Sequence, residues 1–213
     1  MKTPPPMNAN VKRLKFQKFF FSFFLSVSIL LATFQAVVFH SNTFEKSNTQ
    51  ERISIHNDVL GYLKNNKESL PELDFTEKEI DHMKDVQHVF QGIKIITIIS
   101  LIAAILVFIN IYGNKNSLKW LPKQLIYAGI AVDAVVVIVA LSIFLNFSSL
   151  FTFLHTLLFQ PGTWQFPLES TLIQLYPQVF FEKLGICIAV TTFVIANIFI
   201  IVPFVIIFLK KNG

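Results

Sequence analysis

The chain has 213 residues, of which 53% are hydrophobic, and its mean hydropathy is +0.58. This composition excludes an ordinary soluble domain and is typical of an integral membrane protein. The formal net charge of +5 averages over segments of opposite character, so it indicates contact with anionic membrane lipid and not with nucleic acid. The single cysteine, Cys187, has no partner in the chain for a disulfide bond.

Four apolar stretches each approach the ~20 residues that a helix needs to cross the hydrocarbon core of a bilayer. Basic residues precede the first stretch, as in a signal peptide, but no small-residue cleavage site closes it convincingly. We therefore expect all four to be transmembrane helices. They cover residues 19–40, 92–112, 125–147 and 184–209.

Charge is distributed unevenly over the remaining segments. Residues 1–18, 113–124 and 210–213 contain ten Lys or Arg and no acid, whereas residues 41–91 and 148–183 contain seven basic and twelve acidic residues. Lys and Arg are enriched in cytoplasmic loops, so we expect both ends of the chain and the middle loop to lie in the cytoplasm. The two acidic segments then form an extracellular cap.

The first cap segment, 41–91, is too long and too patterned for a bare loop. Apolar residues at helical spacing predict a helix over Ile53–Leu63. The sequence Thr76–Glu79 is a capping box, which predicts the start of a second helix. We expect this helix to run to about Phe90 and to continue into the next transmembrane helix, with Gly92 as the joint.

The second cap segment, 148–183, is unusually apolar and aromatic, so we expect it to lie at the membrane surface. Pro161–Gly162 predicts a turn, and Pro177 marks the end of a short element before the fourth helix. Trp164–Phe166 and Phe39–Thr43 can pair as short strands. The predicted fold is therefore an all-α membrane protein with a mainly helical cap.

All five histidines lie outside the expected cytoplasmic segments. His40, at the end of the first helix, and His56, in a polar context on a surface helix, need no special explanation. In the helix that begins at Thr76, a rotation of 100° per residue places His82 at the border of the apolar face and His88 on the opposite side. Only His82 then has surroundings that tune its pKa.

Asp85 lies three residues after His82 and is placed to accept a hydrogen bond from its ring. A His–Asp pair that only ties down the helix is an equally open interpretation. His155 is flanked by apolar residues just beyond the third predicted helix, where a polar ring is costly unless it is used or paired. We expect both histidines to lie at the outer membrane interface.

Other chemical motifs are missing from the sequence. It contains no HExxH, CxxC, G-x-S-x-G or P-loop pattern, so we expect no metal and no cofactor. Asp133 is the one acid inside a predicted transmembrane helix, and the only other charge there is Lys94 at a helix end. We interpret Asp133 as a hydrogen-bonding partner of a neighbouring helix and not as part of an ion pathway.

Two outer segments resemble the bacterial lipoprotein intramolecular transacylase family. The similar strings are Phe75–Val86, His155–Phe159 through Trp164, Leu172–Ile173 and Tyr176–Phe181. The resemblance implies a cell-membrane enzyme with four transmembrane helices under an extracellular cap that holds the active site. Such an enzyme moves the sn-2 acyl chain of a diacylglyceryl-cysteine lipoprotein to the α-amino group of the same cysteine, which gives a lyso-form lipoprotein.

The resemblance implies that His82 and His155 are catalytic. We expect His82 to act as general base toward the α-ammonium group, with Asp85 orienting it. His155 then stabilises the oxyanion or protonates the leaving glyceryl oxygen, and the two roles are interchangeable. Three aromatic residues are expected to wall the site and exclude water. They are Phe159, Trp164 and Tyr176.

Two other interpretations stay open. One is a non-enzymatic membrane protein whose cap binds a lipid or a partner protein and whose histidines only satisfy hydrogen bonds. The other is a metal-assisted membrane hydrolase in which the outer histidines hold a metal together with Glu79, Asp85 or Glu169.

Overall fold

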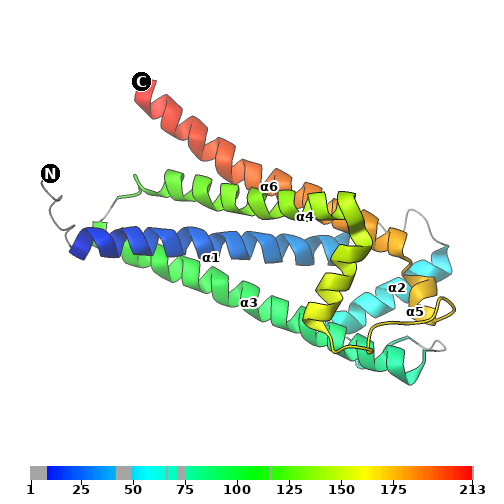
Figure 1. Ribbon diagram of the computed structural model, residues 1–213. Coiled ribbons are helices and arrows are strands. Elements are labelled where there is room, and N and C mark those ends of the chain that lie inside the picture. Colours follow the sequence, from blue (N-terminus) through cyan, green and yellow to red (C-terminus); the bar gives the residue numbers. More distant parts are fainter. Residues whose placement is uncertain (1–8, 42–48, 66, 72–74, 116, 213) are drawn as a thin grey trace, which may run out of the picture. The chain divides into compact units, whose positions relative to one another are not determined.

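The computed structural model describes residues 9–41, 49–65, 67–71, 75–115 and 117–212. These residues form six helices and no strand (Figure 1). The helices are α1 (Ala9–His40), α2 (Gln50–Leu63), α3 (Glu77–Lys115), α4 (Leu121–Leu158), α5 (Thr171–Leu175) and α6 (Gln178–Asn212).

The short strands suggested by the sequence are not found within this described part of the chain. Trp164–Phe166 is irregular, and Phe39 and His40 are the last two residues of α1. Asn42 and Thr43 lie outside the described residues.

Four of the helices, α1, α3, α4 and α6, are long and apolar enough to cross a membrane. Many of their large apolar side chains are exposed, which is unfavourable in water but suits contact with lipid. The prediction of an all-helical, multi-pass membrane protein is thereby confirmed.

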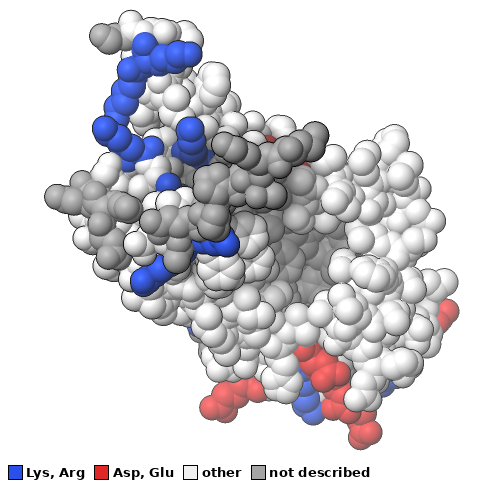
Figure 2. Space-filling model, turned by 60° about the vertical axis from the view of Figure 1, so that its left-hand side comes forward, with Lys and Arg blue, Asp and Glu red and all other residues white. Residues whose placement is uncertain are grey.

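The chain divides into two compact units, and each long helix contributes one part to each. Unit 1 comprises residues 1–31, 96–135 and 192–213, and unit 2 comprises residues 32–95 and 136–191. Unit 1 contains ten Lys or Arg and one acid, whereas unit 2 contains eight basic and twelve acidic residues. Figure 2 shows most of the visible Lys and Arg side chains together on one part of the displayed face, and a few others beside Asp and Glu side chains.

Inside unit 1, α1 and α4 are joined by serine hydroxyls. The Ser22 hydroxyl shares its proton between the backbone and side-chain oxygens of Gln124, at 3.0 and 2.9 Å. The Ser26 hydroxyl shares its proton between the Ser22 carbonyl of its own helix, at 2.7 Å, and the Ala128 carbonyl of α4, at 3.2 Å. Such bonds replace the water that a polar group lacks in a bilayer, and small residues let the two backbones approach.

Helices α4 and α6 also meet in unit 1. A Cβ atom on Gly129 would lie 2.8 Å from the Ala196 carbonyl oxygen, so only glycine fits this crossing. Four residues further along α4, Asp133 accepts a hydrogen bond from the Asn197 amide at 3.3 Å. This confirms that the intramembrane acid bonds to a neighbouring helix.

Unit 2 has its own apolar core. Residues of α2, α3 and α5 form it, and those of α2 and of α5 follow helical spacing. They are Val59, Tyr62, Leu63, Met83, Leu172 and Leu175. The predicted helix over Ile53–Leu63 is confirmed as α2, which begins three residues earlier, at Gln50.

The predicted capping box starts α3. The Thr76 N–H and hydroxyl both donate to one carboxylate oxygen of Glu79, at 2.8 and 2.9 Å, and the Glu79 N–H points back to the Thr76 hydroxyl at 3.3 Å. The other carboxylate oxygen accepts from the Leu172 N–H in α5, at 2.8 Å. Glu79 is completely buried and therefore links two cap helices through one charged group.

The polar first part of α3 reaches Gln91, and the apolar stretch begins after it. The helix passes through Gly92 without interruption, which confirms the predicted continuation into the transmembrane helix and shows that the helix has no break at Gly92. Nothing lies within 4 Å of a Cβ atom placed on Gly92, which shows that no close contact forces a break there.

Helix α4 contains a bend that the sequence did not predict. At Asn146 the backbone is extended, with φ −164° and ψ 88°, and the helical arm after it leaves at a steep angle (Figure 1). The Asn146 side chain accepts from the Ser149 N–H at 2.9 Å and so caps this arm, which runs to Leu158.

The loop after the arm contains the predicted turn at Pro161–Gly162. Gly162 has φ +87°, a conformation that favours glycine. Pro177 separates α5 from α6, as expected.

A partly buried hydrogen bond joins α2 to the segment after α5. The His56 ring nitrogen Nδ1 lies 3.0 Å from the Tyr176 hydroxyl, and only 7% of His56 is exposed. Burial lowers the pKa of His56 to about 4. The expectation that His56 sits in a polar surface environment is therefore wrong: the apolar residues of α2 carry this ring into the core.

Replacing Glu79 by alanine is expected to lower the free energy of unfolding by about 2 kcal/mol or more, because it removes charged hydrogen bonds and leaves the Leu172 N–H without an acceptor. Thermal unfolding of the purified protein in detergent measures the effect. Glu77→Ala is the matched control, since Glu77 is exposed in the same helical turn. Equal losses in the two variants would contradict the central role of Glu79.

Acidification is expected to destabilise the protein partly through His56. Between about pH 6.5 and pH 4 the unfolded chain binds a proton at this residue that the folded protein does not bind, so stability falls as the pH falls through this window. His56→Gln should make the dependence of the unfolding temperature on pH shallower. His88→Gln, at an exposed position of α3, should leave it unchanged, and an equal change in both variants would rule out burial of His56 as the cause.

Candidate active site

Two histidines from different helices meet in unit 2. His82 comes from the polar first part of α3, and His155 comes from the arm of α4 after the bend. Their ring centroids are 6.2 Å apart and the ring planes differ by 27°. The structure buries His82 and exposes His88, as the helical spacing indicated.

The backbone of the α4 arm orients His155. Its ring nitrogen Nδ1 lies 2.8 Å from the Phe151 carbonyl oxygen, one turn earlier. A carbonyl oxygen only accepts hydrogen bonds, so Nδ1 must carry the proton. In the neutral ring, Nε2 is then the nitrogen with a free lone pair. The Phe151 ring stacks on His155 with centroids 3.8 Å apart and helps to hold it in place.

Aromatic side chains surround the pair. The His82 ring lies 4.8 Å from Phe159 and 5.4 Å from Phe166. The His155 ring lies 5.0 Å from Trp164 and 5.4 Å from Phe159. The structure thus brings two of the predicted wall residues, Phe159 and Trp164, to the histidines.

Tyr176, the third predicted wall residue, makes its described contacts elsewhere. Its hydroxyl bonds to His56, and its ring lies 5.2 Å from Phe180 and 6.3 Å from Phe181. Phe181 in turn lies 5.5 Å from Phe151, which stacks on His155. Among the described ring contacts, Tyr176 is connected to His155 through the rings of Phe181 and Phe151.

Asp85 is exposed on α3, and no hydrogen bond joins it to His82 among the described residues. Its carboxylate influences His82 through charge alone. Burial is the main cause that lowers the pKa of His82 to about 4; the nearby His155 and Lys78 act in the same direction, and Asp85 opposes them. Burial also lowers the pKa of His155, and the hydrogen bond to the Phe151 carbonyl raises it by a smaller amount. Both rings are therefore neutral at pH 7.

Two polar atoms beside the pair have no hydrogen-bond partner in the described part of the chain. They are Nδ1 of His82 and the indole Nε1 of Trp164, and both are buried. Buried polar atoms are normally paired, so these two unpaired atoms are candidate positions for contact with a bound polar group.

Three contact residues were not predicted, namely Phe151, Phe166 and Lys78. The Lys78 ammonium group lies 5.2 Å over the Phe166 ring and donates to the Gln165 carbonyl at 2.6 Å, which holds this loop against His82. Lys78 lies inside the capping box. Its position one turn before His82 was the only feature of the sequence that could have indicated a place near the histidine pair.

The residues considered as metal ligands do not assemble. Both oxygens of Glu79 already accept hydrogen bonds from the protein. Within the described residues, no group of three or more His, Cys, Asp or Glu side chains is placed to hold a metal ion.

Comparison with known proteins identifies similar chains. The family model described as lipoprotein intramolecular transacylase Lit matches residues 13–181. An uncharacterized protein from Aquifex aeolicus (strain VF5) is 28% identical over 135 residues, which are 62% of this chain and 55% of that protein. The chain thus matches only about half the length of this curated relative.

Solved structures of the membrane integral lipoprotein intramolecular transacylase Lit from Bacillus cereus have the same fold. One covers 95% of this chain and 99% of its own, with 20% identity and a TM-score of 0.82. A variant of it with one histidine replaced by alanine has 19% identity and a TM-score of 0.78, and covers 96% of this chain and 98% of its own. The family model matches well over half of the residues of this chain, and the chain therefore belongs to the lipoprotein intramolecular transacylase family.

Proposed function

We propose that this protein is a membrane acyltransferase that moves the sn-2 acyl chain of a diacylglyceryl-cysteine lipoprotein to the α-amino group of the same cysteine. The observation that carries the proposal is the pairing of His82 and His155, 6.2 Å apart inside an aromatic enclosure. Family membership supports the class of reaction. The product is a lyso-form lipoprotein with a free glyceryl hydroxyl.

The reaction needs little more than positioning and proton transfer. The substrate contains both the ester and the amine, so no serine or cysteine nucleophile of the protein is required. Holding two reacting groups in good orientation supplies up to about 7–11 kcal/mol of the barrier. The amine nitrogen then attacks the ester carbonyl, the bond from carbon to the glyceryl oxygen breaks, and one proton passes from the nitrogen to that oxygen.

The hydrogen bonding of the two rings favours His155 as the general base and His82 as the group that stabilises the oxyanion. These roles are the reverse of the assignment expected first from the sequence. His155 has Nδ1 occupied by the Phe151 carbonyl, which leaves Nε2 as a base with a free lone pair. It accepts the amine proton and returns it to the leaving glyceryl oxygen. His82 is deeply buried and neutral, so it serves as a hydrogen-bond donor to the developing oxyanion.

The enclosure supports transfer to the amine over hydrolysis. Phe151, Phe159, Trp164 and Phe166 place apolar ring surfaces around the two histidines. Water would compete with the amine for the ester, and its exclusion also strengthens hydrogen bonds to the oxyanion. The unpaired Nδ1 of His82 and Nε1 of Trp164 lie where an ester or peptide oxygen can bind them.

The charge distribution supports an extracellular active site. Unit 1, with ten basic residues and one acid, has the character of a cytoplasmic half, and the histidine pair belongs to unit 2. In this topology residues 1–18, 113–124 and 210–213 are cytoplasmic, and residues 41–91 and 148–183 form the extracellular cap.

Substitution of either histidine is expected to lower the activity, to an extent that depends on the replacement. His155→Gln should lose the base, a loss of about 10²–10⁴-fold. His82→Gln should retain part of the activity, because an amide still donates a hydrogen bond, whereas His82→Ala should not. The assay is mass spectrometry of the N-terminal peptide of a model diacylated lipoprotein, co-expressed in a host that lacks N-acylation.

His88→Gln, on the exposed side of α3, is the matched control and should leave the product unchanged. Retained turnover in His155→Gln would remove the base assignment. An unmodified lipoprotein with the unaltered protein would favour a cap that binds lipid or a partner protein without catalysis.

Topology is tested by labelling single cysteines with a membrane-impermeant maleimide on intact cells, in a Cys187→Ala background. Glu77→Cys, exposed in unit 2, should react, and Lys211→Cys, exposed at the end of α6, should react only after the cells are permeabilised. The reverse pattern would place the histidine pair on the cytoplasmic side.

A further inference from the structure

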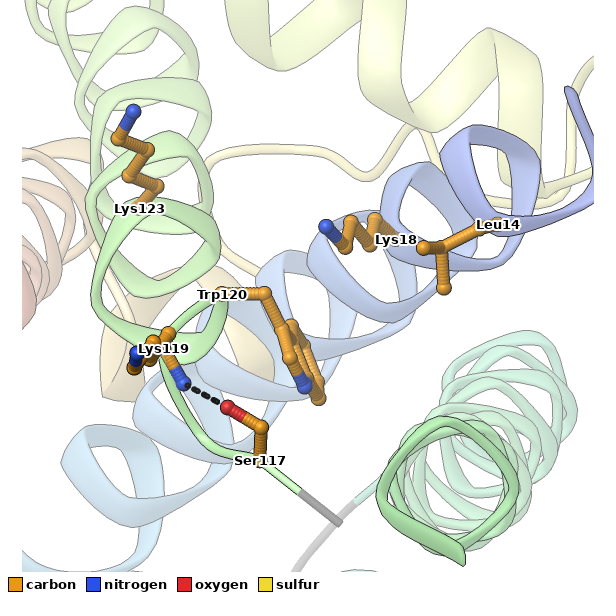
Figure 3. A pocket seen from close by; sticks show the side chains of 6 residues that line it. All are labelled: Leu14, Lys18, Ser117, Lys119, Trp120 and Lys123. Atoms are coloured by element: carbon orange, nitrogen blue, oxygen red, sulfur yellow. Dashed lines mark hydrogen bonds between the residues drawn. The ribbon is translucent and has the colours of Figure 1, made fainter. Parts of the chain in front are cut away.

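A basic pocket lies in unit 1, and none of its lining residues belongs to unit 2. It has a volume of about 370 Å³ and is lined by side chains from α1, from the loop before α4 and from the start of α4 (Figure 3). The lining residues are Leu14, Lys18, Ser117, Lys119, Trp120 and Lys123. Half of them are lysines, and none is acidic.

The positive charge of this pocket is uncompensated. No ion pair involves Lys18, Lys119 or Lys123 within the residues that the structure describes. The pocket also lies at the beginning of α4, which starts at Leu121 and whose N-terminal end carries a partial positive charge. Three lysines line this cavity beside a helix N-terminus, and this concentration of positive charge favours a bound anion.

Trp120 supplies a second, independent observation. Only 7% of it is exposed, and its ring packs edge-to-face on Phe21 with centroids 5.2 Å apart. Its indole Nε1 is buried and has no hydrogen-bond partner in the described part of the chain. An unpaired buried N–H is unfavourable, and an oxygen-rich anion in the pocket that Trp120 lines brings acceptors of the kind it needs.

The position of the lysines identifies the source of the anion. Lys18 immediately precedes the apolar stretch of α1, and Lys123 precedes that of α4 by two residues. This is the depth at which a helix leaves the hydrocarbon core and meets lipid headgroups. Leu14 and the Trp120 ring add apolar surface, which suits a ligand with an acyl-bearing part better than free phosphate.

We propose that this pocket binds the phosphate group of an anionic phospholipid. The lysines neutralise the phosphate as flexible point charges, the start of α4 adds its dipole, and the apolar side chains contact the glycerol backbone. The site is separate from the transacylase chemistry and does not rest on it.

Native mass spectrometry of the purified protein in nonionic detergent tests the proposal, with phosphatidylglycerol and phosphatidylcholine as the lipid probes. The unaltered protein should retain phosphatidylglycerol, whereas phosphatidylcholine should bind more weakly because its choline cation meets three lysines. The variant Lys18→Gln/Lys119→Gln/Lys123→Gln should bind phosphatidylglycerol about tenfold or more weakly.

The variant Arg13→Gln/Lys210→Gln/Lys211→Gln is the matched control, because it removes the same charge from unit 1 outside the pocket. It should bind phosphatidylglycerol as the unaltered protein does. Equal weakening in both triple variants, or equal binding of the two lipids, overturns the site. Displacement of the lipid by millimolar inorganic phosphate overturns the lipid assignment in favour of a free-phosphate site.

Two further variants keep the test decisive if the triple pocket variant does not fold. Lys119→Gln/Lys123→Gln changes only exposed side chains and should still weaken phosphatidylglycerol binding. Trp120→Phe keeps an aromatic ring against Phe21 and removes only the N–H, so weaker binding with an unchanged unfolding temperature would assign the indole to the anion. Unchanged lipid binding in both variants overturns the proposal.

Discussion

One buried carboxylate organises the cap. Glu79 begins α3 by accepting from Thr76, and the same side chain holds the start of α5 through the Leu172 N–H. Burial alone would raise the pKa of this carboxyl, but the hydrogen bonds from Leu172, Thr76 and Thr171 lower it below its usual value, so the group stays ionised. His82 lies three residues later, and its position follows from where Glu79 starts the helix.

Helical periodicity accounts for what the sequence predicted well. The apolar stretches identified the four long helices, the capping box identified the start of α3, and the 100° rotation separated buried His82 from exposed His88. Each of these features depends on residues close together in the chain. The pairing of His82 with His155 came from the family resemblance, because residues 73 positions apart cannot be brought together by local spacing.

The features that the sequence did not reveal depend on the backbone or on long-range contacts. The bend at Asn146 changes the direction of the arm that carries His155. Asparagine is common in loops, so this residue by itself does not predict a bend. Tyr176 was placed at the site by its aromatic character, but a hydrogen bond to His56 holds its hydroxyl in the core. Gly92 has no close neighbour, so the helix had no steric reason to break.

The proton on Nδ1 of His155 is held by a main-chain carbonyl oxygen and not by a side chain. Its Nδ1 is held by the main-chain oxygen of Phe151, whereas many reactive histidines rely on a carboxylate side chain for this purpose. Every amino acid at position 151 would present the same oxygen while the arm stays helical. The hydrogen bond that sets the tautomer therefore does not depend on the side chain at position 151. A substitution there would report the loss of the ring that stacks on His155, and not the role of the main-chain oxygen that holds the proton.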